Sequence, residues 1–242
     1  MRRFALLFVV LTLLPFAVAS AQDAPSPSFD ALRDSIDAIL TRTGAPGAGV
    51  VVFSSDSIRW EGYAGLADRA SDRPVTRETA FRAGSISKSI VSTAVLLLAE
   101  EGRLNLDDPV RELVPEIEIQ NPWAETDPVR VAHVLEHTAG FDDLPIHEYF
   151  AQSPGITIRE GLAANPDTRR VRWRPGTYFS YSSVGPPVAA YIVEQITGQP
   201  FEDFVVERVF DPLGMTASSF LLDDRVEPHL ATGYESDGET MR

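Results

Sequence analysis

The stretch of residues 85–101 constrains the fold most, because it predicts a long helix with almost no polar face. Its apolar side chains recur at helical spacing, and Gly102 follows as a stop signal. They are Ile86, Ile90, Val91, Ala94, Val95, Leu97 and Leu98. A helix that is apolar nearly all round has to be covered by other elements. We therefore predict that this helix is buried at the centre of the molecule.

The remaining periodic segments predict a helix, a hairpin and then mostly helices. The first helix begins at Phe29 and ends before Gly44, and Val-rich runs at 47–53 and 58–66 around a polar turn predict a β-hairpin packed on it. Further helices are predicted at 129–137, 184–196 and 201–209, with Pro128 at a first helical turn. This order indicates an α+β fold whose helices are inserted after the first strands.

The first 21 residues have the pattern of a secretory signal peptide. Arg2 and Arg3 precede an apolar run at 4–18 that ends in small residues, so cleavage is predicted before Gln22. An uncleaved anchor is the alternative, but the run is shorter than the ~20 apolar residues of a membrane span. We expect no stable membrane anchor, a periplasmic or secreted protein, and a flexible linker at 22–28.

Composition excludes several classes of function. The 35 acidic and 21 basic side chains give a net charge of −14, so the surface should repel nucleic acid and anionic lipid. The absence of cysteine excludes disulfides, thiolate zinc sites, iron–sulfur clusters and a cysteine nucleophile. Neither a Walker loop nor a Gly-x-Gly-x-x-Gly segment occurs, and we predict no cofactor. Oligomeric state is not predicted.

The only lysine among the 21 basic residues is Lys88, three positions after Ser85. This spacing places the hydroxyl and the amine on one face of the first helical turn. The positive end of the helix dipole would stabilise an oxyanion at the serine. A lysine buried beneath the serine can lose its proton and act as a base, which arginine cannot do. Ser85 and Lys88 are therefore candidate catalytic residues.

Several blocks in a fixed order carry a resemblance to a known family. They are FRAGSISKS, EEGRLNLDDPV, VRVAHVLEHTAGF, RPGTYFSYSSVG, the long segment AAYIVEQITGQPFEDFVVERVFDPLGM, and ATGY. Together they resemble the serine β-lactamase and penicillin-binding-protein superfamily, in its class C β-lactamase-like branch. The resemblance implies a β-lactamase/transpeptidase-like fold, in which a large helical region is inserted into an antiparallel sheet.

The resemblance also implies a third catalytic residue. The family's second motif is Tyr-x-Asn, and Tyr181 matches its tyrosine, which shares the role of general base with the lysine. A phenol near an ammonium has a lowered pKa and can shuttle the serine proton. Ser183 stands where the family has asparagine and is a candidate substrate-binding residue. Its hydroxyl lacks the paired donor and acceptor of an amide, which weakens a β-lactamase or peptidase function more than an esterase one.

The family's third motif, Lys-Thr-Gly or His-x-Gly, does not occur, since His229 is followed by Leu230 and Ala231. We expect a domain over 29–242 that lacks its C-terminal strands. The predicted function is that of an exported serine hydrolase, which forms an acyl-enzyme with a small-molecule or peptide substrate: a D-amino-acid peptide, an ester or a β-lactam. The alternative is a catalytically impaired, penicillin-recognising binding protein that keeps the cleft.

One competing motif suggests a metal site. His133 and His137 form an H-x-x-E-H pattern, which would place both imidazoles on one helical face. No third ligand is evident, and His137-Thr138-Ala139-Gly140 also matches the family's helix end and turn. We therefore predict no metal site and a structural turn at His137.

Overall fold

The computed structural model describes residues 29–145 and 155–235. The predicted signal peptide at 1–21 and linker at 22–28 lie outside the described residues. Within the part described, no helix combines the length and apolarity needed to cross a membrane.

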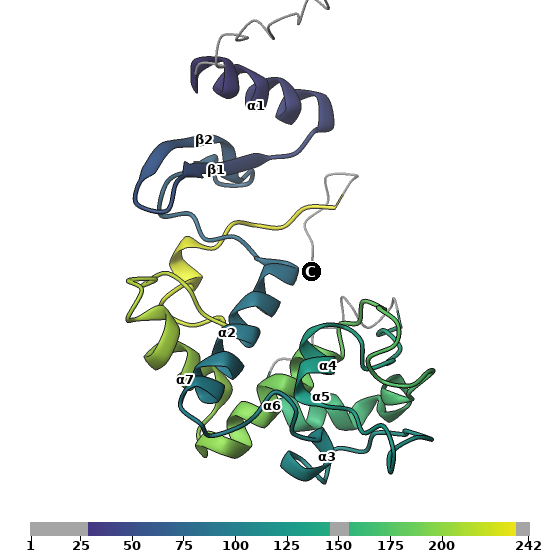
Figure 1. Ribbon diagram of the computed structural model, residues 1–242. Coiled ribbons are helices and arrows are strands. Elements are labelled where there is room, and N and C mark those ends of the chain that lie inside the picture. The colour runs from purple at the N-terminus through teal and green to yellow at the C-terminus, as the bar shows by residue number, and fades with distance from the viewer. Residues whose placement is uncertain (1–28, 146–154, 236–242) are drawn as a thin grey trace, which may run out of the picture.

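The chain begins with a helix and a small antiparallel sheet, which we call the sheet region. Helix α1 (Phe29–Thr43) is followed by strands β1 (Gly47–Phe53), β2 (Ile58–Asp68) and β3 (Arg73–Pro74), in the order β1-β2-β3. The ring of Phe29 stacks on Trp60 of β2 with centroids 5.8 Å apart. The predicted first helix and hairpin are present, and α1 lies over the hairpin (Figure 1). β3 was not predicted, because two residues are too short to show an alternating pattern.

A larger helical region follows the sheet. Its elements are η1 (Gly84–Ile86), α2 (Ser87–Glu100), α3 (Val110–Leu113), α4 (Val131–Leu135), α5 (Ile158–Ala164), η3 (Pro166–Arg169), α6 (Gly185–Thr197), α7 (Phe201–Val205), the π-helix η4 (Val206–Phe210) and η5 (Glu227–His229). Figure 1 shows α2 running away from the sheet region into this bundle. The predicted helix at 129–137 is shorter than expected, and Pro128 precedes it instead of lying in its first turn.

Helix α6, and not α2, is the central helix. It packs against α2, α3, α4, α5 and α7, and its buried residues are Gly185, Val188, Ala189, Ala190, Tyr191, Ile192 and Val193. Helix α2 buries one face through Val91, Ala94, Val95 and Leu98, whereas Leu96 is 49% exposed. The prediction that α2 is the buried central helix was wrong, because apolar composition does not determine how many faces neighbouring elements cover.

Close contact between α4 and α6 depends on a glycine at the start of α6. A Cβ added at Gly185 would lie only 2.9 Å from the carbonyl oxygen of Val134. Any larger residue would therefore push the two helices apart. Because the tyrosine of the candidate site lies four residues before Gly185, this contact also determines how closely the segment before α6 approaches α4.

The last described segment returns to the sheet region (yellow in Figure 1). The Ala80 N–H donates to His229 O at 2.9 Å, and the Ala231 N–H donates back to Ala80 O at 2.8 Å. The Thr232 N–H donates to Ala67 O in β2 at 2.8 Å. These bonds connect the end of the helical region to the sheet and to the residues just before η1.

Candidate active site

The candidate nucleophile lies at the start of α2. Ser85 is in the 3₁₀ turn η1, which continues directly into α2, and its side chain is exposed to solvent. Gly84 before it has φ = 53°, a conformation that glycine adopts without strain. The first N–H groups of a helix lack helical acceptors and carry its positive dipole end, so this position suits a developing negative charge.

Three candidate residues meet through hydrogen bonds. Ser85 Oγ lies 2.7 Å from the hydroxyl oxygen of Tyr181. Lys88 Nζ donates to Ser85 Oγ at 3.1 Å. Lys88 is half-buried, not fully buried as the sequence suggested, and its Nζ lies 4.9 Å from the centre of the Tyr181 ring. Residues 96 positions apart in the chain are therefore arranged as a nucleophile with two adjacent proton carriers.

Electrostatics favour the ionised form of Tyr181. Hydrogen bonds from Lys88 and then Ser85 hold the pKa of the Tyr181 hydroxyl below its ordinary value, although partial burial opposes the shift. The Ser183 hydroxyl contributes in the same direction. A phenol with a lowered pKa can accept the serine proton nearer to neutral pH than a free tyrosine can.

Hydrogen bonds hold the segment that carries Tyr181 on both sides of the tyrosine. The Ser182 side chain is only 3% exposed, and its Oγ donates to Asp142 O at 2.8 Å. The Ser182 N–H donates to His137 Nδ1 at 3.3 Å. The Ser180 N–H donates to His137 O at 2.8 Å. Tyr181 is thus held by its two neighbours, while its own side chain stays 43% exposed and accessible.

Ser183 lies beside the triad of Ser85, Lys88 and Tyr181, but its backbone is hydrogen-bonded to a residue outside that triad. Its N–H donates to Asp143 Oδ1 at 2.7 Å, while its hydroxyl contacts Tyr181. Ser183 therefore supports Tyr181 and the loop that carries it. The predicted site residues Ser85, Lys88, Tyr181 and Ser183 are all within this one cluster.

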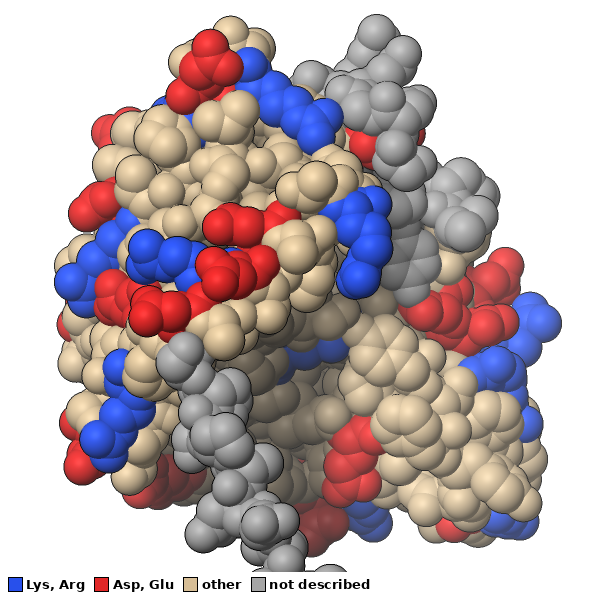
Figure 2. Space-filling view, turned by 90° about the horizontal axis from the view of Figure 1, so that it is seen from above, with Lys and Arg blue, Asp and Glu red and all other residues tan. Residues whose placement is uncertain are grey.

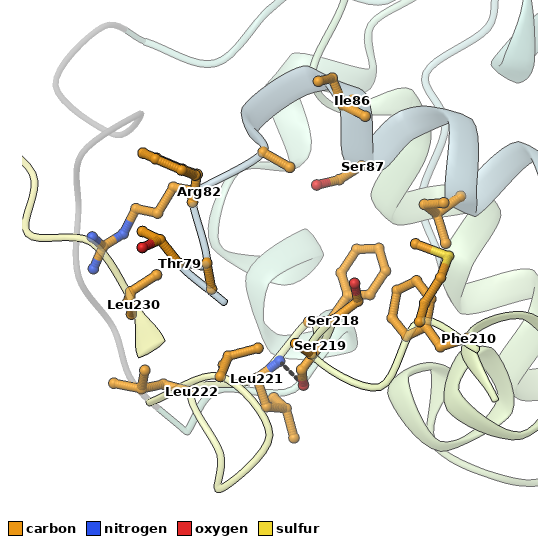
Figure 3. Close-up of a pocket in the computed structure, with 18 residues that line it drawn as sticks. Thr79, Arg82, Ile86, Ser87, Phe210, Ser218, Ser219, Leu221, Leu222 and Leu230 are labelled. Carbon is orange, nitrogen blue, oxygen red and sulfur yellow. Dashed lines mark hydrogen bonds between the residues drawn. The ribbon is translucent and has the colours of Figure 1, made fainter. Parts of the chain in front are cut away.

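An apolar groove of about 570 Å³ lies next to the triad without including it. Ile86, Ser87 and Ile90 of η1 and α2 form one wall, and residues such as Phe210, Ser219 and Leu221 form the opposite wall (Figure 3). At 100° per residue, Ile86, Ser87 and Ile90 project from the side of the helix opposite to Ser85 and Lys88. The groove is therefore a separate surface from the candidate active site.

The histidine pair of the competing metal motif does not form a ligand cluster. His133 Nδ1 accepts from the Arg130 N–H at 3.2 Å, whereas His137 Nδ1 accepts from the Ser182 N–H. Among residues 29–145 and 155–235, no three His, Asp or Glu side chains are grouped so that they could hold a metal ion.

Comparisons with known proteins place this site in a family. The sequence profile of the Beta-lactamase family matches residues 32–242, which include all of the site. The chain belongs to the Beta-lactamase family. This confirms the resemblance that the sequence blocks indicated, and the fold is the β-lactamase/transpeptidase-like α+β fold.

Three relatives illustrate the range of the family. A β-lactamase of Yersinia enterocolitica is 29% identical, with 87% of this chain and 51% of that protein covered. Esterase EstB of Burkholderia gladioli is 31% identical, with 84% of this chain and 56% of the esterase covered. The octameric penicillin-binding protein homologue from Pyrococcus abyssi superimposes with a TM-score of 0.79 at 29% identity, with 88% and 50% covered. The chain thus spans about half the length of the proteins it matches.

Sequence reasoning missed three residues that hold the Beta-lactamase-family site in place. Ser182 and Asp143 anchor the tyrosine segment, and His137 lies against the Tyr181 ring with centroids 4.6 Å apart. The match of His137-Thr138-Ala139-Gly140 to the family's helix end predicts only a structural turn at His137. Its positive φ of 61°, unusual for a residue other than glycine, is visible only in the structure.

Charge on one face is mixed. Figure 2 shows acidic side chains interleaved with basic ones, on a face that is hollowed near its centre. Exposed ion pairs such as Arg111–Glu125, at 2.8 Å, contribute little stability each.

Proposed function

We propose that this chain is part of an exported serine hydrolase that is acylated on Ser85 by an ester or amide carbonyl. The observation that carries the proposal is a pair of hydrogen bonds at Ser85 Oγ, one of 2.7 Å shared with the Tyr181 hydroxyl and one of 3.1 Å donated by Lys88 Nζ. The lowered pKa of Tyr181 and membership of the Beta-lactamase family support it.

The proposed reaction has two halves. Ser85 Oγ attacks the carbonyl carbon, and its proton passes to the Tyr181 oxygen, which Lys88 stabilises by a hydrogen bond. The new Oγ–C bond is then retained while the C–O or C–N bond of the substrate breaks, and the leaving group takes a proton from the Lys88 ammonium. Water then loses a proton to the Tyr181–Lys88 pair and attacks the acyl carbon. The acyl C–Oγ bond breaks, the pair returns a proton to Ser85 Oγ, and the acid is released.

Ester substrates fit this site better than β-lactams or peptides. The serine at position 183 replaces the family's asparagine, and its N–H is already donated to Asp143. A serine hydroxyl cannot present a donor and an acceptor to an amide substrate as an asparagine side chain can. The similarity to esterase EstB points in the same direction. We rank generic ester or peptide substrates first, with esters ahead of peptides, and β-lactams last.

Covalent labelling tests the nucleophile. The complete protein is treated with a fluorophosphonate, and the modified residue is located by mass spectrometry. Labelling on Ser85 that disappears in Ser85→Ala supports the proposal. Ser87→Ala is the matched control, because Ser87 lies two positions away and lines the groove on the opposite face of the helix. Label that persists in Ser85→Ala refutes the assignment.

A penicillin-recognising binding protein is the second candidate, and the replacement of asparagine by Ser183 favours it. Such a protein would be acylated by a fluorescent penicillin and would not release the acid. A stable Ser85 adduct combined with no turnover of activated esters would support this candidate over the hydrolase.

Export is proposed from residues 1–21 alone. Cutting there would remove two arginines and no acidic residue, which changes the net charge from −14 to −16. Sequencing of the mature N-terminus from an exporting host tests the predicted cleavage before Gln22. An intact Met1 on the exported protein would rule out the cleavage.

A further inference from the structure

His137 contacts the segment of Tyr181 at three points. Its carbonyl oxygen accepts from the Ser180 N–H at 2.8 Å, and its Nδ1 accepts from the Ser182 N–H at 3.3 Å. Its ring lies against the Tyr181 ring with centroids 4.6 Å apart and planes 32° apart. The two residues that flank Tyr181 thus both donate their backbone N–H to His137, whose ring also contacts the tyrosine itself.

The backbone of His137 is held in an unfavourable conformation to make these contacts. Its φ of 61° is in the left-handed region, where the Cβ of an L-residue comes too close to the following carbonyl oxygen. Glycine, which has no Cβ, would fit that conformation more easily. Strain of this kind persists where the surroundings fix it, and it concentrates at functional sites. A turn that only ends a helix does not require an imidazole here.

The hydrogen bond from Ser182 also fixes the protonation state of the ring. Nδ1 can accept from an N–H only when it carries no proton itself, so the imidazole must be neutral with its proton on Nε2. Protonation at Nδ1 would leave two donors, the Nδ1–H of His137 and the N–H of Ser182, facing each other without an acceptor. It would also place a second cation near Lys88 of α2, which faces the same ring.

We propose that His137 is a positioning residue that holds Tyr181 against Ser85, and that only its neutral imidazole can do so. The inference rests on the proposed function, because it assigns His137 a part in placing the proposed base. The charged and titratable groups that face the ring are Lys88 of α2, Asp143 of the following loop and Tyr181 itself.

The direction of the pH effect follows from the surroundings. Burial and then the charge of Lys88 lower the pKa of His137 from its ordinary 6.5, against an opposing effect of Asp143. The neutral ring is therefore favoured in the folded protein. The contribution of the neutral ring to holding Tyr181 is complete above pH 6.5, and it is lost as the pH falls through the lowered pKa of His137. Acylation should lose rate on the acidic side for this reason.

Two variants separate the proposed contacts. His137→Gly keeps the left-handed backbone but removes the ring and the Nδ1 acceptor. His137→Asn tolerates the same backbone and offers Oδ1 near the position of Nδ1, but does not titrate. His133→Asn is the matched control, because His133 has a similar backbone hydrogen bond and a lowered pKa without touching Tyr181.

The first measurement is the rate of fluorophosphonate labelling of Ser85 from pH 5 to pH 9 in the complete protein. His137→Gly should be labelled roughly 10- to 100-fold more slowly at pH 7.5, the range for a misplaced catalytic group. His137→Asn should stay within about threefold of wild type at pH 7.5 and lack the loss below pH 6.5 that His137 causes. His133→Asn should follow the wild-type profile. Labelling of His137→Gly at the wild-type rate, or an unchanged acidic loss in His137→Asn, would overturn the proposal.

A second measurement does not depend on activity. Ionisation of Tyr181 is followed by ultraviolet absorbance as the difference between each protein and its Tyr181→Phe partner, since the chain has 6 tyrosines. His137→Gly should raise the pKa of Tyr181, because the ring is no longer held beside Lys88. An unchanged Tyr181 titration overturns the inference even if Ser85 is never labelled. Absence of labelling on wild-type Ser85, with a shifted titration, refutes the proposed function alone.

Discussion

The helical region and the sheet region differ in how much apolar surface they bury. The main hydrophobic cluster begins at Val91 and ends at Phe210, so it lies entirely in the helical region. The sheet region contributes Ala67 and Val75 to the buried set, and α1 has no buried residue. Phe53 at the end of β1 is 75% exposed. The helical region therefore has a core of its own, and the sheet region of the described chain depends mostly on its backbone ladder and surface contacts.

This difference explains where precise geometry is available. Ser85 and Lys88 are carried by η1 and α2, and Tyr181 is held by the loop before α6. These elements pack on the buried core, whereas no side chain of the sheet contributes to the triad. A proton-transfer site needs atoms fixed within fractions of an ångström, which a dense core provides better than a sparsely covered sheet.

The largest effect should come from changing the lysine of the proton-transferring Tyr181–Lys88 pair, because this leaves the packing of both regions unchanged. Lys88→Arg keeps the positive charge but cannot lose a proton near neutral pH. Labelling or acylation of Ser85 should fall roughly 10²- to 10⁴-fold, with the melting temperature unchanged. Stopped-flow acylation by an activated ester measures this. Arg82 lines the apolar groove, so Arg82→Lys is the control: it makes the reverse exchange away from the triad and should keep the wild-type rate. More than about a tenth of the wild-type rate in Lys88→Arg would contradict the assignment.

The second effect tests the core of the helical region. Phe204 in α7 is 1% exposed, so Phe204→Ala should lower the free energy of unfolding by about 3–5 kcal/mol. Urea unfolding monitored by circular dichroism measures the loss. A change below about 1 kcal/mol would mean that the helical region can close around a large cavity and is not the rigid part of the molecule.

Hydrogen exchange should show the same contrast without any substitution. Amides within α6, where residues such as Val188 and Ile192 are fully buried, should exchange at least about tenfold more slowly than those of β1. Mass spectrometry of peptides from both segments measures the rates. Equal protection in the two segments would show that the regions unfold as one cooperative unit.

The smallest effect on stability is expected from a phenylalanine-to-alanine substitution in the sheet region. Phe53→Ala changes a side chain that is mostly in solvent, so the free energy of unfolding should change by no more than about 0.5 kcal/mol. It is the matched control for Phe204→Ala in the same urea experiment. A loss of 2 kcal/mol or more, which is typical of a buried aromatic, would show that the outer face of β1 is covered in solution.

Much of the fold could be predicted from the sequence, because helical and alternating periodicity are local properties. The bounds of the first helix, of β1 and of α6 differ by at most one or two residues from the periodic segments, and Gly198 ends α6 with φ = 74°. The central position of α6 was not predictable. Periodicity gives the apolar face of one element, whereas burial depends on how many other elements pack around it.

The candidate site, too, could be predicted from the sequence only in part. Ser85 and Lys88 are three residues apart on one helix, so their spacing alone predicts that they meet. Tyr181 was found through the family resemblance, since nothing local connects it to Ser85. His137 and Ser182 as its anchors were decided by tertiary structure alone. Their contact requires the turn after α4 to lie beside the loop before α6, and that arrangement results from helix packing at Gly185, which no short sequence pattern encodes.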